Sequence, residues 1–203
     1  MTYTDLISEF SSGNLDACIS KGEIFLLENP RHQDALFLMA VAHHDIVYDE
    51  GAMAIFMALE QHSIPFLKRL LAQDPFHAKA LYTLLAYTLI NQADLKKDAI
   101  AKQHIQEANK SEFIAYASRL ITNSDMEQHG YDFLVQLYEI FADVENQTLY
   151  IEKGLQFCAI NFAEDREMRD RETSVFILKK IKRLQQEPTA KEAMLDLLRK
   201  ELK

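Results

Sequence analysis

The 203-residue chain has no tryptophan and only 4 prolines, 5 glycines and 2 cysteines. β-Turns and long loops rely on proline and glycine, so their scarcity favours helices joined by short connections. Cys18 and Cys158 lie far apart in the sequence and form no Cys-x-x-Cys pattern, which disfavours a zinc site or a redox pair. We expect both to be buried free thiols, because unpaired cysteine behaves as a small hydrophobic residue.

Long apolar runs and targeting signals are also missing. No stretch approaches the ~20 apolar residues that a membrane-spanning helix requires. The opening residues, Met1 to Asp5, contain no basic segment and no apolar core of the kind found in secretory signals. We therefore expect a soluble, cytoplasmic protein that does not engage a membrane.

Positive charge is scarce over most of the chain. Residues 1–165 contain 11 lysines and arginines against 24 aspartates and glutamates, whereas residues 166–203 contain 11 against 7. An acidic surface repels phosphate backbones, so we expect a basic protein or peptide as partner and no nucleic acid.

The C-terminal part has one basic run, Lys179, Lys180, Lys182 and Arg183. It lies in the last turns of a predicted helix, where the negative end of the helix dipole stabilises positive charge. Contact with an acidic partner, or with the chain's own acidic body, is the alternative.

The feature around which the chain is organised is a pattern that occurs twice. Asn29-Pro30-Arg31-His32 precedes Ala35-Leu36, and Asp74-Pro75-Phe76-His77 precedes Ala80-Leu81, an offset of 75 − 30 = 45 residues. Proline ends one helix and permits a new one just beyond it, which predicts antiparallel helical hairpins. His32 and His77 recur at the same place, so we expect them to have a structural role near the helix start.

The residues after each proline carry a resemblance to a known family. Small and large apolar residues stand at matching positions, namely Ala35, Leu36, Met39 and Ala40, then Ala80, Leu81, Leu84 and Leu85. Gly13, Leu15 and Cys18 fit a Gly-x-aromatic-x-x-Ala turn. Over about residues 4 to 90 the chain resembles the tetratricopeptide repeats, although it lacks their tryptophan and exceeds their ~34-residue period. An inserted helix within Asp49 to His62 would account for the extra residues.

This resemblance implies an all-α fold, a right-handed superhelical array of antiparallel hairpins (an α-solenoid) with a C-terminal capping bundle. We treat residues 1–203 as one helical-repeat domain, in which 1–90 hold recognisable hairpins and 91–203 hold degenerate hairpins and capping helices. A separate bundle over 91–203 is the alternative. Capping boxes at Ser124–Glu127 and Thr189–Glu192 predict two helix starts. The other predicted helices are 4–10, 15–28, 31–48, 51–61, one capped by Ser63, 76–90, 94–109, 111–121, 148–162 and 167–186.

In repeats of this kind the first helix of each hairpin lines a concave groove. Residues that point away from the buried stripes should be available there to a partner. On that basis the predicted partner-binding aromatic and histidine residues are Phe37, His44, Tyr48, Tyr82 and Tyr87. The carboxylates Asp45, Asp49 and Glu50 would select a basic ligand. Packing of the aromatic side chains against the inserted helix is the alternative.

The densest cluster of potential metal ligands or catalytic groups runs from His43 to Glu50. Ligands on one helix must be three or four positions apart, and only Asp45 and Asp49 meet that condition. No phosphate-binding loop or nucleophile motif is present. We expect a non-catalytic interaction module without metal or cofactor. The alternatives are an immunity- or inhibitor-type protein that neutralises a basic toxin or nuclease, and a metal-dependent enzyme using the His43–Glu50 cluster.

Overall fold

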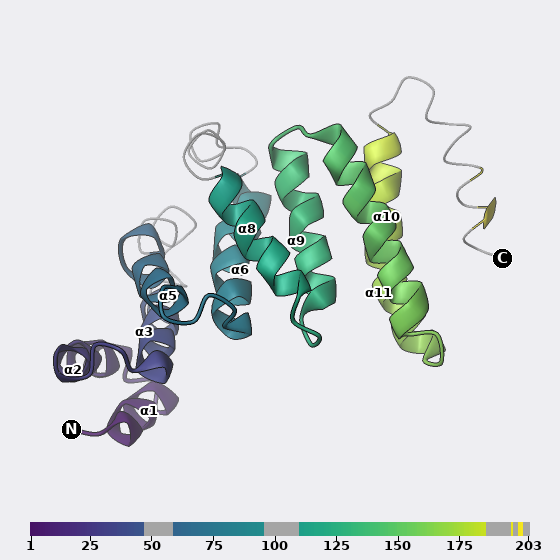
Figure 1. Cartoon of the computed structure of the whole chain (residues 1–203). Coiled ribbons are helices and arrows are strands. Elements are labelled where there is room, and N and C mark those ends of the chain that lie inside the picture. Colours follow the sequence, from purple (N-terminus) through teal and green to yellow (C-terminus); the bar gives the residue numbers. More distant parts are fainter. Residues whose placement is uncertain (47–58, 96–109, 186–195, 197–198, 201–203) are drawn as a thin grey trace. The chain divides into compact units, whose positions relative to one another are not determined.

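A computed structural model of the chain describes residues 1–46, 59–95, 110–185, 196 and 199–200. Helices joined by short turns make up these residues, with no strand among them, which confirms the all-α prediction (Figure 1). The chain divides into two compact units, unit 1 (Met1–Ala108) and unit 2 (Asn109–Lys203). The interpretation of the whole chain as one repeat domain stays a prediction.

Unit 1 consists of helices in which each packs against the next along the chain. They are α1 (Tyr3–Ser11), α2 (Leu15–Glu28), α3 (Gln33–Asp45), the short π-helix η1 (Leu59–Ser63), α5 (Ile64–Leu71) and α6 (Ala78–Leu95). In addition, α1 contacts α3. Most of the predicted inserted helix, residues 51–58, lies outside the described residues. Its last three residues, 59–61, belong to η1. Because η1 continues directly into α5, Ser63 has helical backbone angles and its side chain does not cap the helix.

The core of unit 1 contains both apolar stripes that the repeated pattern predicts. The side chains with no exposed surface include Ala35, Leu36, Met39 and Ala40 on α3, and Ala80, Leu81, Leu84 and Leu85 on α6. Between α2 and α3, Gly22 allows close approach: a Cβ there would lie 2.1 Å from the Met39 sulfur. The burial of the two stripes is confirmed, whereas the tetratricopeptide resemblance stays a prediction.

The two recurring histidines start their helices in the same way. His32 Nδ1 accepts a hydrogen bond from the Ala35 N–H at 3.2 Å, and His77 Nδ1 accepts one from the Ala80 N–H at 3.2 Å. Each ring thereby satisfies one of the backbone donors that the first turn of a helix leaves unpaired. This confirms their structural role. Because each histidine precedes the helix as its cap, α3 and α6 begin at Gln33 and Ala78, two residues later than predicted.

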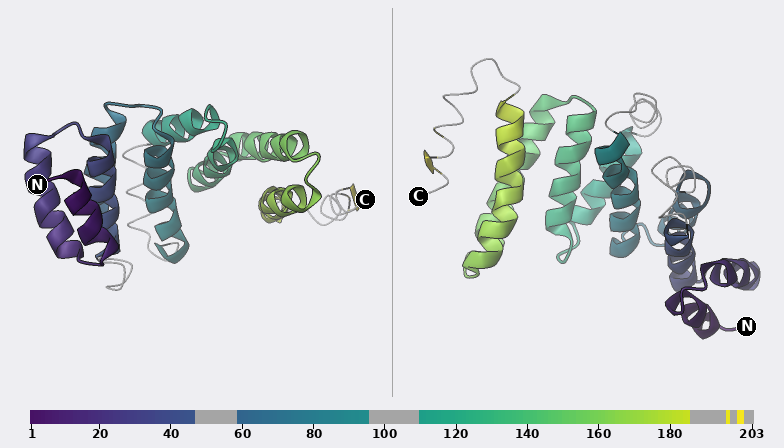
Figure 2. Two further views of the ribbon diagram at one scale, coloured as in Figure 1. Left: turned by 90° about the horizontal axis from the view of Figure 1, so that it is seen from below. Right: turned by 180° about the vertical axis from the view of Figure 1, so that it is seen from behind.

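Unit 2 contains four helices among its described residues, each packed on the next. They are α8 (Lys110–Ile121), α9 (Glu127–Ile140), α10 (Val144–Asn161) and α11 (Arg166–Leu184). Seen from behind in Figure 2, α11 lies alongside α10. Cys158 belongs to the core of this unit and Cys18 to the core of unit 1, and both are free thiols, as predicted.

Two helix starts in unit 2 differ from the predictions. The Ser124 capping box is wrong, because the Ser124 hydroxyl donates to Asp125 and α9 begins only at Glu127, without a side-chain cap. A local turn, in which the Asp125 N–H bonds to the Asn123 side chain, competes for these residues. In α10 the start is earlier than predicted, at Val144, because Asp143 caps the helix. The predicted helix from Thr189 begins outside the described residues.

Candidate functional site

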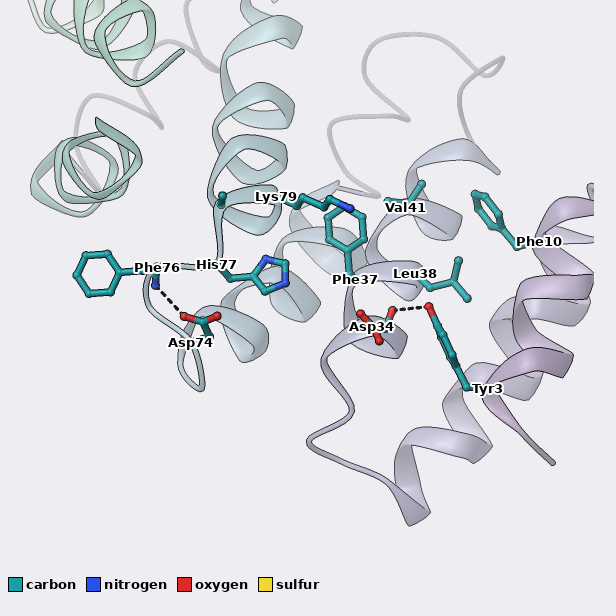
Figure 3. A pocket seen from close by; sticks show the side chains of 11 residues that line it. Tyr3, Phe10, Asp34, Phe37, Leu38, Val41, Asp74, Phe76, His77 and Lys79 are labelled. Atoms are coloured by element: carbon teal, nitrogen blue, oxygen red, sulfur yellow. Dashed lines mark hydrogen bonds between the residues drawn. The ribbon is translucent and has the colours of Figure 1, made fainter. Parts of the chain in front are cut away.

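Unit 1 contains an open groove between α1, α3 and the start of α6, with a volume of about 550 Å³ (Figure 3). Its apolar surface comes from Phe10, Phe37, Leu38 and Val41. Its polar side chains are Tyr3, Asp34, Asp74, His77 and Lys79. The groove therefore combines an aromatic and aliphatic surface with acidic groups, which is the composition that favours a partly apolar, basic ligand.

One stripe of α3 provides much of this lining. Asp34, Phe37, Leu38 and Val41 recur at the spacing of three or four residues that places side chains on one helix face. The stripe lies next to the buried stripe of the same helix. Packing of α3 into the core therefore fixes the direction in which the groove side chains point.

The two carboxylates lie at the starts of α3 and α6, Asp34 in the first turn of α3 and Asp74 in the turn before α6. Asp74 Oδ1 accepts a hydrogen bond from the Phe76 N–H at 3.1 Å, which holds this carboxylate beside the start of α6. The Phe76 ring points away from the groove and is exposed (Figure 3). Asp34 lies in the first turn of α3, and its backbone carbonyl accepts a hydrogen bond from the Tyr3 hydroxyl at 3.4 Å. This bond connects α1 to α3 at the edge of the groove.

His77 contributes both a ring contact and a donor to the groove. Its ring lies against Phe37, with 6.4 Å between the ring centroids. Because Nδ1 accepts the capping hydrogen bond, the proton of the neutral ring sits on Nε2, which can donate. The groove thus offers a hydrogen-bond donor close to its apolar wall.

The balance of charge in the groove is negative. Asp34 is exposed and Asp74 is half-buried. Neither carboxylate forms an ion pair with a residue that the structure describes. Lys79 is the cation of the groove lining. Two carboxylates against one ammonium group leave a net negative site for a basic ligand.

No protein-family model and no curated protein matches the chain. Within the described ranges, no helix combines the length and the apolar content that a membrane crossing requires. The chemistry of the groove therefore carries the functional inference.

The structure places the predicted binding residues in different surroundings. Phe37 lines the groove. His44 on α3 and Tyr87 on α6 stack on each other, with ring centroids 4.3 Å apart and an interplanar angle of 7°. Burial, reinforced by the nearby Asp45 carboxylate, raises the pKa of the Tyr87 hydroxyl. These two rings pack on each other, and so present less surface to a ligand than predicted. Their packing against the inserted helix, the alternative, falls on residues outside the described ranges.

Of the remaining predicted residues, the two that the structure describes, Asp45 and Tyr82, are not part of the groove lining. Asp45 is exposed and lies 2.9 Å from Nδ1 of the neighbouring His44. Tyr82 occupies on α6 the repeat position that Phe37 has on α3, and it is half-buried. Tyr48, Asp49 and Glu50 lie outside the described residues. Their role in binding stays a prediction.

Sequence reasoning missed most of the groove. Tyr3 and Phe10 come from α1, which reaches the groove through its contact with α3. No local pattern encodes that contact. The sequence could have predicted the stripe of α3, however. Asp34, Phe37, Leu38 and Val41 follow one another at spacings of three or four residues, which places them on the same helix face.

His43 lies on the other side of α3 and is nearly fully buried. Its ring stacks on His62 of η1 at 4.8 Å and lies 5.7 Å from Phe66 of α5. Burial lowers the pKa of His43, the His62 ring lowers it further, and Glu23 opposes both effects. His43 and His44 thus face different neighbours, and no group of three metal-binding side chains exists among the described residues.

Unit 2 has an open groove of its own, of about 500 Å³, lined by α8, α9 and α10. Tyr131, Tyr150 and Phe157 form its aromatic wall. Its charged side chains are Glu127 and Lys153, which balance each other. This groove therefore lacks the acidic character of the groove in unit 1.

Proposed function

We propose that the protein is a non-catalytic interaction module that binds a basic segment of a protein or peptide in the groove of unit 1. The observation that carries this proposal is the union of an apolar wall around Phe37 with the carboxylates of Asp34 and Asp74. Lysine and arginine side chains have an apolar stem and a charged end, and both parts find a complementary surface in this groove.

The helices that form the groove support a tetratricopeptide-like arrangement of unit 1. The first helix of each expected hairpin is α1, α3 or α6, and all three contribute lining residues. The resemblance implies that these helices line the concave face. The finer architecture, a right-handed superhelix with C-terminal capping helices, forms part of the same proposal.

The groove's lysine adds a preference for orientation. Lys79 repels a second basic side chain from its end of the groove, and it favours a backbone carbonyl or a carboxylate of the ligand there. We therefore propose that the bound segment has a basic side chain next to an aliphatic or aromatic one, and that both occupy the groove.

The two buried, unpaired cysteines fit a reducing compartment, and we propose that the protein acts in the cytoplasm.

An array of immobilised peptides that differ in charge and apolar content tests this proposal. Basic, partly apolar peptides should bind, and acidic peptides of the same composition otherwise should not. For the best peptide, Phe37→Ala should weaken binding by about 2 kcal/mol or more, the usual effect of removing a central aromatic contact. Circular dichroism of the variant shows whether the fold is retained.

The carboxylates need a matched control. Asp74→Asn and Asp34→Asn keep the side-chain shape but remove the charge, and should slow association most at low salt. Asp16→Asn removes an exposed charge on α2 that does not line the groove. Equal losses for Asp16→Asn and Asp74→Asn would show that only overall charge matters and would overturn the groove as the binding site.

A further inference from the structure

The helix α11 of unit 2 has a single fully buried apolar side chain. Of the 19 residues of α11, only Phe176 is fully buried. It joins a cluster with Val135 of α9 and Ile151 and Cys158 of α10. The apolar Leu178, two residues further on, is 65% exposed. Val175, Ile177, Ile181 and Leu184 are half-buried, so Phe176 is the one side chain of α11 that is removed completely from solvent.

A glycine on α10 makes room for the Phe176 ring. A Cβ on Gly154 of α10 would lie 2.2 Å from the Phe176 ring, so the ring rests directly on the α10 backbone. No larger residue fits at position 154 without moving the ring. Gly154 and its surroundings thus form a notch for one aromatic side chain.

Ion pairs complete the attachment. Lys179 and Lys182 of α11 pair with Asp132 and Glu139 of α9, the second pair at 2.5 Å. Lys180 pairs with Glu152 of α10 at 2.5 Å. The basic run therefore contacts the chain's own acidic surface, one of the two alternatives that the sequence left open.

The ion pairs of α11 can be broken, or replaced by pairs with another basic helix, at low free-energy cost. Glu152 and Lys182 are about half exposed, whereas Lys179 and Asp132 are 20% and 25% exposed. Partly exposed ion pairs contribute little individually and weaken with salt. A segment with few buried apolar contacts opens at low free-energy cost compared with the unit as a whole. The face of α9 and α10 beneath α11 is thus complementary to a basic helix with one aromatic anchor.

We propose that α11 is an exchangeable helix, and that the face of α9 and α10 beneath it accepts a basic amphipathic helix of a partner protein in its place. The partner helix carries one aromatic residue for the Gly154 notch. Its lysines or arginines reach Asp132, Glu139 and Glu152. This surface belongs to unit 2, so the proposal does not depend on the groove of unit 1.

Cys158 reports on the docking of α11. Its side chain has no exposed surface and lies beneath α11, near Glu172 and Thr173 of that helix. Burial raises the pKa of the Cys158 thiol to about 11, and the Glu172 carboxylate adds to this effect. When α11 leaves, the thiol becomes accessible and its pKa returns toward the ordinary value, so it reacts faster.

The first experiment measures maleimide labelling of the wild-type chain at neutral pH, with each site quantified by peptide mass spectrometry. Cys18, buried in unit 1, is the internal control. Raising the ionic strength to ~1 M, where the Debye length is about 3 Å, should accelerate Cys158 about fivefold relative to Cys18. A ratio that does not change with salt overturns the proposal.

The second experiment fills the notch. Gly154→Ala should expel Phe176 and accelerate Cys158 labelling about tenfold or more at low salt, while Thr148→Ala on the exposed face of α10 leaves it unchanged. An unchanged rate for Gly154→Ala overturns the proposal. If Cys18 also reacts faster and helicity falls, the variant has unfolded, and the salt series of the wild-type chain decides.

The third experiment supplies the helix from outside, with a fluorescent synthetic peptide of residues 166–185 as the probe. It should bind the full-length wild-type chain and lose about tenfold or more in affinity when its Phe176 is alanine. Absence of binding, or equal binding by the alanine peptide, overturns the specific surface. A concentration-dependent dimer in sedimentation analysis would assign the surface to a second copy of the chain instead of a partner.

Discussion

The helices α3 and α11 illustrate two ways of attaching a helix to its unit. In α3, 13 residues include five side chains without any exposed surface, and four of them, Ala35, Leu36, Met39 and Ala40, form one continuous stripe. In α11, 19 residues include one such side chain, and ion pairs to α9 and α10 add to its attachment. An apolar stripe is insensitive to ionic strength, whereas ion pairs are screened. The groove of unit 1 therefore rests on a helix held by an apolar stripe, while in unit 2 the attachment of α11, which lines no groove, depends more on charge.

The largest effect is expected from shortening the stripe residues themselves. Leu36→Ala and Leu81→Ala should each lower the free energy of unfolding by about 2 to 5 kcal/mol, the usual effect of lost burial plus a cavity. Denaturant titration followed by circular dichroism measures the change. Arg31→Ala and Lys79→Ala, at exposed positions next to the same helices, should do far less. Equal effects at all four positions would contradict the assignment of the stripes.

The next largest effect is expected from acidification, which should lower the stability of unit 1 through His43. The folded state lowers the pKa of this ring below its ordinary value of 6.5. As the pH falls, His43 is therefore protonated in the unfolded chain at a higher pH than in the folded chain. Its contribution to stability is complete above pH 6.5 and is lost as the pH falls below that value through the folded-state pKa. His43→Phe keeps a planar ring beside His62 but cannot titrate. The variant should lose this part of the pH dependence, and parallel stability curves for both proteins would refute the assignment.

A smaller effect is expected at the helix starts of unit 1. His32→Ala and His77→Ala each remove a capping acceptor and should lower the free energy of unfolding by about 1 kcal/mol. Asparagine is a good cap, so His32→Asn and His77→Asn should retain most of that stability. Thermal unfolding of these four variants, of the neighbouring controls Gln33→Ala and Lys79→Ala, and of the wild-type chain measures the differences. If asparagine fails as completely as alanine, ring packing and not capping explains the histidines.

The smallest effect is expected for a single ion pair of α11. A double-mutant cycle with Lys180→Ala and Glu152→Ala should give a coupling free energy of about 0.2 to 1 kcal/mol, and this value should shrink as salt is added. The same cycle measured at low and high ionic strength provides the test. A coupling that is large and independent of salt would mean that α11 is attached as firmly as α3.

The sequence predicts the core of unit 1 well because that core depends on local periodicity. Leu36, Met39, Leu81 and Leu84 follow the 3.6-residue period of a helix, and the recurring proline fixes where each period begins. The helix starts are less well predicted. Ser124 had the right spacing to Glu127, but Asn123 accepts hydrogen bonds from the Asp125 and Met126 N–H groups in a local turn, and the capping box does not form.

The candidate site is less predictable, because it depends on contacts between distant segments. Phe37 could be found as an outward-facing residue of α3. Tyr3 and Phe10 reach the groove only because α1 packs on α3. Tyr87 carries the aromatic character that the sequence favours for binding, yet its ring is occupied by His44. A pattern along one helix gives the direction of a side chain but does not give the neighbour that meets it.

The turn between α9 and α10 contains a residue whose type does not suit its backbone. Ala142 has φ 53, a left-handed conformation that disfavours side chains with a Cβ. Natural chains need only enough stability to function, and such positions are unused reserves for protein engineering. Replacing Ala142 by glycine relieves the Cβ clash, at a site that lines neither groove and lies outside α11. A laboratory that needs a sturdier version of this protein for crystallisation or for use as a binding scaffold should begin there.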